Sequence, residues 1–382
     1  MKLGIDLHNI RDGGGVNYMT NLCAAFDPQR HGFSRLVLFG AADTLEKMAG
    51  DNPFIEKVVL PQLSKGFAHR MRFLLFQLDG ELRRNDCDML YSPGGLYFGR
   101  FRPFGSISRN MMPFQTEQWS GYRRLRDLIR LRILRWANSQ TFRRTDAMIF
   151  LTRIAKDAVS EIAKLSCGRS RIIPHGVNRK VFVPGEQMDG RSPSPDQPIH
   201  IVYPSRLEPY KHQLEAMEAV AAVRARYPHI RLSMCGPANP EYASRVEERR
   251  LALDPGGNFL HYVGALNTGE LVALYRKSDL LLFASSCENL PNTLIEAMAA
   301  QIPVISSNCE PMPSVGLDGC LYVDPKNPQS IAEGIRHALD EWSATLSRRD
   351  RAAELANSYS WEKCADETFG YLYDVASSCR RK

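Results

Sequence analysis

Two glutamates at positions 288 and 296 follow the most apolar strand-like run in the chain, residues 280–284. Glu288 lies in the loop after that run, and Glu296 lies one turn into a helix expected to start near Asn292. Carboxylates here can accept hydrogen bonds, Glu288 from sugar hydroxyls and Glu296 from a ribose diol. The N–H groups at the helix start, around Asn292 and Thr293, can hold a phosphate. The alternative for Glu296 is an ordinary helix acid stabilised by the dipole.

Two cations, Arg206 and Lys211, lie on the loop that follows another strand-like run, residues 199–204. The planar guanidinium of an arginine and the point charge of a lysine together suit a diphosphate. Solvated surface charge is the common alternative for such residues.

Three glycines at positions 13–15 follow the first expected strand, residues 2–7, and precede a helix expected to begin near Val16. Glycines let the backbone approach a ligand closely, and a helix N-terminus favours an anion. The dinucleotide fingerprint fails because Tyr18 stands where its third glycine would be. A flexible turn is the alternative, and a nicotinamide-dependent dehydrogenase is disfavoured. His175 near the middle of the chain gives no chemical indication by its spacing alone.

The elements that would position these residues alternate between strand and helix in both halves of the chain. Such alternation predicts parallel sheets covered by helices on both faces, and ligands in such folds bind beyond the carboxyl ends of the strands. A length of 382 residues favours two domains. A Pro/Ser/Gly/Asp-rich stretch at 184–198 resembles a linker. The fold class expected is therefore α/β, with two Rossmann-like, doubly wound domains.

The charge is distributed unevenly. Residues 1–190 contain 29 Lys+Arg and 18 Asp+Glu, whereas the remainder contains 20 and 24, and the whole chain carries a net charge of +7. A basic half suggests an anionic partner. The helical segment 122–144 interleaves Leu, Ile and Trp with a single acid, Asp127, and eight arginines: Arg123, Arg124, Arg126, Arg130, Arg132, Arg135, Arg143 and Arg144. It could lie on an anionic membrane, or it could be a domain helix with an apolar core face and solvated arginines.

The nine cysteines are scattered and never form a Cys-x-x-Cys pair, which favours reduced thiols in a cytoplasmic protein over a disulfide framework or zinc ribbon. No run of 18 apolar residues predicts a membrane-spanning helix, and the first residues have the pattern of a strand rather than a signal peptide. No His/Asp cluster has the spacing of metal ligands, so no metal or other cofactor is expected. Nothing indicates nucleic-acid binding.

Several motifs together resemble the GT-B retaining glycosyltransferases of glycosyltransferase family 4. The Glu288-x7-Glu296 block is the most specific of them. The others occur in the family's order and at its usual distances: Arg206-x4-Lys211, residues 173–178 around His175, the early glycine-rich loop, residues 323–325 and residues 360–363. The resemblance covers most of residues 170–375 well and the N-terminal half weakly.

This resemblance implies two facing domains: an acceptor-side domain of residues 1–170 plus 361–382, completed by the last helix, and a donor-binding domain of residues 171–360. The resemblance implies that Arg206 and Lys211 bind the diphosphate and that Glu288 binds the donor sugar, as the catalytic residues. It also implies that Asn292 and Thr293 bind phosphate oxygens and that Glu296 binds the ribose. Gly14 and Gly15 would close over the donor. No metal is required, because the two cations stabilise the departing diphosphate.

The sequence departs from the family pattern in two places. Asn289 stands where the family often has glycine, and no His-Asp pair follows the strand that faces the acceptor. Arg109 or Asn110 would take that place, with His175 also assigned to the acceptor side. The resemblance further implies that the enzyme transfers a hexose, either mannose or a related sugar, from a GDP-linked donor. The acceptor would be a saccharide or a lipid-linked saccharide in the synthesis of a bacterial surface polysaccharide such as O-antigen. A lipid-linked acceptor would place the protein peripherally on the inner face of the membrane.

Two alternatives on the same architecture stay open. One is a catalytically silent subunit that binds a glycan or nucleotide, and the other is a nucleotide-sugar epimerase. The joint presence of Arg206, Lys211, Glu288 and Glu296 argues against the silent subunit.

Overall fold

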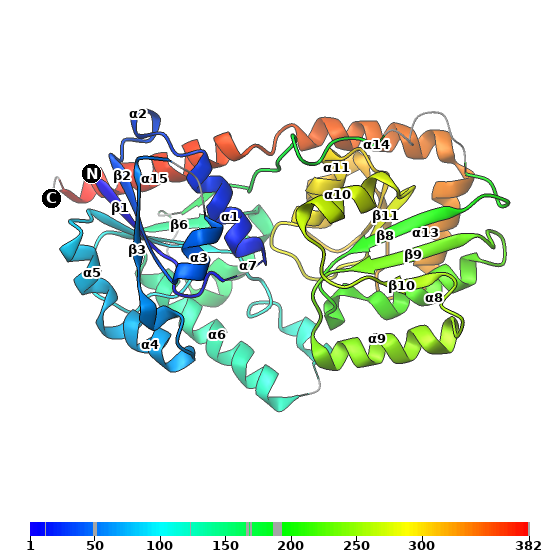
Figure 1. Ribbon diagram of the computed structural model, residues 1–382, viewed down its shortest axis with the longest axis horizontal. Coiled ribbons are helices and arrows are strands. Elements are labelled where there is room, and N and C mark those ends of the chain that lie inside the picture. Colours follow the sequence, from blue (N-terminus) through cyan, green and yellow to red (C-terminus); the bar gives the residue numbers. More distant parts are fainter. Residues whose placement is uncertain are drawn as a thin grey trace. The chain divides into compact units, whose positions relative to one another are not determined.

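The computed structural model describes residues 1–11, 13–48, 52–122, 124–165, 168, 170–185 and 193–380. The chain forms two compact units (Figure 1). The first unit comprises Met1–Phe114, Leu125–Gly176 and Ser360–Lys382, and the second comprises Gln115–Arg124 and Val177–Tyr359. Arg123 and residues 186–192 of the predicted linker lie outside the described residues.

The first unit is built on a seven-stranded parallel sheet in the order β3-β2-β1-β4-β5-β6-β7. Its strands are β1 (Lys2–Asp6), β2 (Arg35–Gly40), β3 (Ile55–Val59), β4 (Met89–Ser92), β5 (Phe104–Ser108), β6 (Ala147–Phe150) and β7 (Ser170–Ile172). Its helices are α1 (Gly13–Ala24), α2 (Pro28–His31), α3 (Ala42–Lys47), α4 (Phe67–Phe76), α5 (Leu78–Arg84), α6 (Leu125–Arg144), α7 (Arg153–Ala163) and α15 (Trp361–Arg380). The last helix, α15, thus returns to the first unit and packs on α1, α2 and β6, as predicted.

The second unit is built on a six-stranded sheet in the order β10-β9-β8-β11-β12-β13, also parallel. Its strands are β8 (Ile199–Pro204), β9 (Ile230–Cys235), β10 (Leu260–Tyr262), β11 (Leu280–Phe283), β12 (Val304–Ser307) and β13 (Leu321–Val323). Its helices are α8 (Gln213–Val223), α9 (Pro240–Leu253), α10 (Thr268–Arg276), α11 (Asn292–Ala299), α12 (Met312–Gly316), α13 (Pro328–Asp340) and α14 (Trp342–Ala356). The predicted fold class, two Rossmann-like parallel-sheet domains, is confirmed.

The central strands are apolar because helices cover both faces of each sheet. All four residues of β11 are buried, as are all four residues of β6. The edge strands differ: β3 alternates irregularly between half-buried and exposed residues, and β7 has no fully buried residue. The core therefore lies along the middle strands, whose carboxyl ends carry the loops of interest.

The domain boundary predicted at residue 170 lies inside the first sheet. β7 pairs with β6 through Met148–Ser170, Ile149–Arg171 and Phe150–Ile172, so the first unit continues to Gly176. That pairing is the physical reason for moving the boundary six residues later.

Residues 115–124, predicted in the first domain, belong to the second unit. Tyr122 donates a hydrogen bond to Glu208 at 3.1 Å, and Ser286 donates one to Gln118 at 2.8 Å. These contacts with residues of the second unit hold the segment there. The expected helix at 122–144 is consequently shorter, because α6 begins at Leu125.

The helix expected near Val16 begins earlier, since α1 starts at Gly13. The glycine-rich stretch is therefore the first turn of a helix and not a loop that precedes one. Gly13 has a φ of 58°, a left-handed conformation that strains any residue with a Cβ atom.

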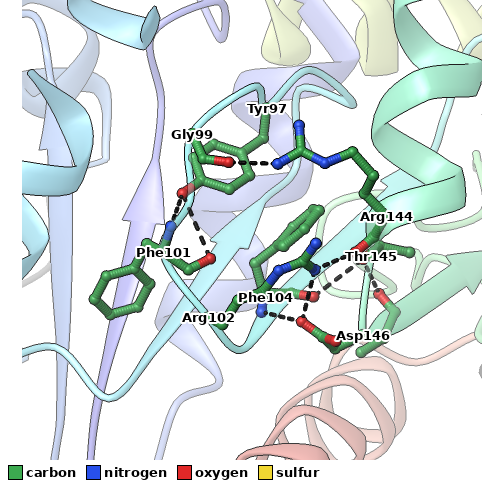
Figure 2. A network of polar contacts seen from close by, with 9 residues as sticks. Tyr97, Gly99, Phe101, Arg102, Phe104, Arg144, Thr145 and Asp146 are labelled. Atoms are coloured by element: carbon green, nitrogen blue, oxygen red, sulfur yellow. Dashed lines mark hydrogen bonds and ion pairs between the residues drawn. The ribbon is translucent and has the colours of Figure 1, made fainter. Parts of the chain in front are cut away.

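The C-terminal end of α6 is fastened to the loop between β4 and β5 (Figure 2). Arg144 Nη2 donates to the carbonyl of Gly99 at 2.6 Å. Asp146, two residues on, accepts from the backbone N–H of Phe104 at 3.0 Å and from Arg102 Nη1 at 2.9 Å. These charge-assisted hydrogen bonds fix the end of α6 to the sheet, while the helix runs outward from it.

Candidate functional site

In the second unit, the strand order reverses between β8 and β11, which are neighbouring parallel strands. Ligands of open α/β sheets bind outside the carboxyl ends of the strands at such a reversal. The loop after β8 carries Arg206 and Lys211, and the loop after β11 carries Glu288. The topology thus gathers three of the predicted site residues at one end of one sheet.

The loop after β8 is held in shape by a buried glutamine. Gln213, the first residue of α8, donates from Nε2 to Ser205 Oγ at 2.8 Å and to the carbonyl of Arg206 at 2.9 Å. A short 3-10 turn, η4 (Pro209–Lys211), follows, and His212 adopts a left-handed conformation between that turn and α8. This tight path turns the side chain of Lys211 inward, where it is 10% exposed.

Lys211 Nζ donates a hydrogen bond to Glu288 Oε1 and forms an ion pair with that carboxylate. The ammonium also lies 5.0 Å from the ring centroid of Phe283 and 5.3 Å from that of Tyr210, which adds cation–π attraction. Withdrawn from water, the two charges stabilise each other, and each is oriented by the other. The predicted diphosphate cation and the predicted sugar ligand are therefore direct neighbours.

A second bridge joins the same two loops. Ser286 donates its backbone N–H to the carbonyl of Tyr210 at 2.9 Å, and its hydroxyl lies 2.9 Å from His212 Nε2. The same hydroxyl donates to Gln118 Oε1 at 2.8 Å. These contacts fix the spacing of the loops, so that the Lys211–Glu288 pair is held on a rigid frame.

Arg206 differs from Lys211 in its surroundings. Its side chain is 52% exposed, and its Nε lies 3.4 Å from Glu208 Oε1. Glu208 is itself held by Tyr122 at 3.1 Å and by Asn239 at 3.3 Å. An exposed guanidinium tethered at one nitrogen can present its remaining donors to an arriving anion.

Glu296 lies on the second turn of α11. Burial raises the pKa of its carboxyl from 4.5 to about 8. The phenol of Tyr275, whose own pKa is raised first by burial and then by the charge of Glu296, lies near it. In the unliganded protein Glu296 is therefore mostly protonated at neutral pH.

The N-terminus of α11 has no side-chain cap, and its N-cap residue is Pro291. The backbone N–H of Asn292 donates to the carbonyl of Leu290 at 2.9 Å, so that amide is occupied. Of the two predicted phosphate donors, Thr293 is therefore the better placed. Asn292 can still contribute its partly exposed side chain.

In the first unit, Gly15 and Arg109 are brought together although they are 94 positions apart in sequence. A Cβ atom on Gly15 would lie 3.1 Å from Arg109 Nη2 and 3.3 Å from Nη1, whereas one on Gly14 would meet nothing within 4 Å. Arg109 Nε donates to the carbonyl of Pro93 at 3.0 Å, and the guanidinium lies 5.5 Å from the ring of Tyr18. Burial lowers its pKa. Among the described residues, no carboxylate forms an ion pair with this guanidinium.

The two other residues assigned to the acceptor side are placed differently. Asn110 is exposed and accepts the N–H of Met112 at 3.1 Å. His175 is 5% exposed and lies between the rings of Tyr18 and Trp361, with centroid distances of 4.6 Å and 5.8 Å. The two rings enclose His175 within the first unit, and its assignment to the acceptor side stays a prediction.

Two polar clusters of the structure were not predicted from the sequence. At the end of β1, the buried Asp6 accepts the N–H of His8 at 3.0 Å and lies 2.6 Å from its Nδ1. In the second unit, Gln118 meets Ser286. The Asp-x-His spacing after the first strand was a signal that could have indicated the first cluster; only tertiary contact reveals the second.

The arrangement offers positive charge and hydrogen-bond donors where two strand-end loops meet. No group of three or more His, Cys, Asp and Glu side chains, searched over the described ranges, is placed to hold a metal ion. Likewise, within that part of the chain no helix is both long and apolar enough to cross a membrane.

Residues 174–357 match the model of the family described as "Glycosyl transferases group 1". Among curated proteins, the chain is 27% identical over 217 residues to a D-inositol 3-phosphate glycosyltransferase of Corynebacterium glutamicum, covering 52% of each protein. It is 30% identical over 112 residues to the O-antigen chain mannosyltransferase B of Escherichia coli, covering 29% of each. The chain thus spans about half the length, or less, of these curated relatives.

Among solved structures, the Anabaena protein HepE in complex with UDP-glucose aligns over the whole of both chains. The TM-score is 0.71 at 15% sequence identity, a likeness of fold alone. The family match and the fold support the resemblance to group 1, GT-B glycosyltransferases. The mannosyltransferase part of the resemblance is supported only by the short stretch shared with the E. coli protein.

Proposed function

We propose that this protein is a retaining glycosyltransferase that moves a hexose from a nucleotide-diphosphate donor to a saccharide or lipid-linked saccharide. The observation that carries the proposal is the Lys211–Glu288 ion pair at the reversal of the second sheet, with Arg206 on the same loop as Lys211. The match of residues 174–357 to a glycosyltransferase family supports it, because that stretch contains this whole constellation.

The chemistry follows from the charges that develop in the reaction. Breaking the bond between the anomeric carbon and the phosphate oxygen leaves negative charge on the diphosphate and positive charge on the sugar ring. Lys211, Arg206 and the N-terminus of α11 stabilise the first charge. Glu288 holds the sugar hydroxyls, and Glu296 binds the ribose diol. The acceptor hydroxyl attacks from the face that the diphosphate leaves, and its proton passes to the departing phosphate oxygen.

For the substrates we propose mannose or a related hexose, a GDP-linked donor and an acceptor belonging to a bacterial surface polysaccharide. The stretch shared with the O-antigen chain mannosyltransferase B supports this choice. The UDP-glucose bound to HepE concerns another protein, but it shows that this fold can hold a nucleotide sugar. A screen of UDP, GDP, ADP and dTDP by thermal shift tests the choice of base. A ligand present at a hundred times its Kd stabilises the protein by about 2.7 kcal/mol.

We place the protein in the cytoplasm, peripheral to the inner face of the membrane, since a lipid-linked acceptor is available there. The contact proposed is the basic segment 122–144, in which α6 carries six arginines and one acid. In this proposal Gly14 and Gly15 stay assigned to the donor, and Arg109, Asn110 and His175 to the acceptor side; all five belong to the first unit.

The decisive experiment measures release of nucleoside diphosphate from the donor with and without acceptor. A transferase releases it only when the acceptor is present and yields a product that keeps the donor's anomeric configuration. An epimerase releases or interconverts the sugar without any acceptor, and a silent binding subunit releases nothing. Either of the last two outcomes would remove the proposal.

A further inference from the structure

The outward face of α6 is apolar. Leu125, Ile129, Ile133 and Trp136 are 66%, 45%, 59% and 60% exposed, respectively. At 3.6 residues per turn these four positions fall on one stripe of the helix. Contiguous exposed apolar surface of this kind marks an interaction site rather than an ordinary surface.

The opposite face of α6 provides the contacts with the core. Leu131, Asn138, Thr141 and Phe142 are buried there. The sequence allowed the interleaved Leu, Ile and Trp residues to be the core face with solvated arginines opposite. That alternative is wrong for Leu125, Ile129, Ile133 and Trp136, because these four apolar side chains form an exposed stripe and not the core face.

Arginines border the exposed stripe of α6 on both sides. Arg126 and Arg130 each follow a stripe residue by one position, and Arg132 precedes Ile133, which places them to either side of the stripe. All three arginines are exposed. The only acid of the helix, Asp127, lies 3.8 Å from Arg126 and is less exposed than it. The face therefore combines apolar side chains in the middle with positive charge at the margins.

A second helix of the first unit, α4, also exposes large apolar side chains, although they do not fall on a single stripe. In α4, Phe67, Leu75 and Phe76 are 70%, 45% and 79% exposed. The helix contains Arg70 and Arg72 and no acid. Together α4 and α6 hold seven of the fourteen large apolar side chains that are exposed among the described residues, so the exposure is concentrated on these two helices.

Phe98 connects the two helices. Its ring stacks on that of Trp136 of α6, with 6.4 Å between the centroids. It also packs against the core cluster that contains Phe73 and Leu74 of α4. Both helices lie along the lower edge of the first unit in the view of Figure 1. The hydrogen bonds of Arg144 anchor the end of α6 to the sheet, so its exposed stripe is presented on a fixed support (Figure 2).

We propose that the exposed faces of α4 and α6 together form a docking surface for an anionic lipid membrane. Aromatic and aliphatic side chains of the two helices enter the headgroup region, and the bordering arginines bind the anionic headgroups. The charge argues for this occupant, since a second copy of the chain would oppose arginines to arginines. The proposal extends the membrane contact beyond residues 122–144 to α4, and binding is measured without substrate, so it stands or falls independently of glycosyl transfer.

Flotation of the full-length protein with vesicles tests the charge requirement. We expect binding to vesicles of equal parts phosphatidylcholine and phosphatidylglycerol, weakening as salt rises, and none to phosphatidylcholine alone. The variant Arg126→Ser/Arg130→Ser/Arg132→Ser should bind at least about tenfold more weakly. The matched control is Arg231→Ser/Lys277→Ser/Arg348→Ser, which removes three exposed cations of the second unit and should bind as the wild type does.

Two further variants test the apolar contacts. Phe67→Ser/Phe76→Ser on α4 and Ile129→Ser/Ile133→Ser on α6 should each reduce binding, while Leu251→Ser/Val263→Ser, at 48% and 47% exposed sites of the second unit, should not. Unchanged circular dichroism would show that the variants fold. Normal binding by the α4 variant would remove α4 from the surface.

The depth of insertion has its own readout. Of the four tryptophans, Trp136 is 60% exposed, Trp119 in the second unit is half-buried, and Trp342 and Trp361 are each 9% exposed. Vesicles with brominated acyl chains should therefore quench tryptophan fluorescence, and Trp136→Phe should abolish most of that quenching. Binding that is independent of lipid charge, or a stable dimer in solution whose formation Ile129→Ser/Ile133→Ser abolishes, would overturn the proposal.

Discussion

Lys211 and Glu288 are 77 positions apart in sequence and form an ion pair between the loops after β8 and β11. Their side chains are only 10% and 16% exposed. The two residues therefore act as a unit, and removing either one leaves its partner's charge poorly solvated. Their proposed functions, one on the diphosphate and one on the sugar, are coupled by this contact.

The first prediction concerns that coupling. Lys211→Ala should lower kcat/KM by at least about a hundredfold, because the charge that stabilises the leaving diphosphate is lost. It should also cost about 1 to 3 kcal/mol of stability, since the Glu288 carboxylate loses its partner. Activity assays and chemical denaturation measure both effects. The double variant Lys211→Ala/Glu288→Ala should be little slower than Lys211→Ala, and strictly additive losses would contradict the coupling.

Arg206→Ala provides the comparison. Because Arg206 is 52% exposed, we expect reduced kcat/KM with a free energy of unfolding close to that of the wild type. Near-normal kcat/KM in both Arg206→Ala and Lys211→Ala would show that the diphosphate binds elsewhere.

The second prediction concerns the pH dependence of nucleotide binding. Burial raises the pKa of Glu296 to about 8, so its carboxyl is mainly protonated at pH 7. If the ribose diol donates hydrogen bonds to the carboxylate form, binding must release a proton. Affinity should then rise with pH and level off above about pH 8. Titration calorimetry in buffers of different ionisation enthalpy measures the proton release. Glu296→Gln should bind with no such dependence, and an equal pH dependence in that variant would exclude Glu296 as its source.

The third prediction separates the two glutamates. Glu296→Ala should mainly weaken nucleotide binding, and Glu288→Ala should mainly lower kcat. The Kd for the nucleoside diphosphate alone and single-turnover rates distinguish these effects. The assignment would be wrong if both variants lost nucleotide affinity to the same extent and retained kcat.

The fourth prediction is that transfer does not need a divalent cation. Arg206 and Lys211 supply the positive charge that Mg²⁺ provides at other diphosphate sites. Rates in excess EDTA should equal those without it. Loss of activity on chelation, with recovery on adding Mg²⁺ or Mn²⁺, would refute this interpretation of the site.

The fifth prediction concerns Arg109, which has no carboxylate partner among the described residues and points at the first turn of α1. Arg109→Gln should raise KM for the acceptor with little effect on nucleotide affinity. Gly15→Ala should raise the same KM, because its Cβ atom would lie 3.1 Å from Arg109 Nη2, and it should also weaken donor binding, because Gly15 is assigned to the donor. Gly80→Ala is the control, since nothing lies within 4 Å of that position. Unchanged acceptor kinetics in Arg109→Gln would exclude an acceptor contact.

Three strands of the first sheet, β3, β5 and β7, have no local pattern from which a strand could be predicted. β3 and β7 are edge strands with largely exposed or half-buried residues, so they lack a clear apolar pattern. β5 is fully buried, but its residues, Phe-Gly-Ser-Ile-Ser, include three small ones that weaken the strand pattern. Both kinds of strand are stabilised by the neighbours with which they pair, and a local window does not contain those neighbours.

The sequence by itself determined the alternating architecture and the loops that carry Arg206, Lys211 and Glu288, because apolar runs and turn residues are local signals. Only the tertiary structure decided that Lys211 and Glu288 touch, that burial raises the pKa of Glu296 and that the Ile129 side of α6 faces outward. The contacts, burial and exposure of a side chain depend on which segments, distant in sequence, pack against it. They therefore arise when the chain is packed and cannot be derived from its local pattern.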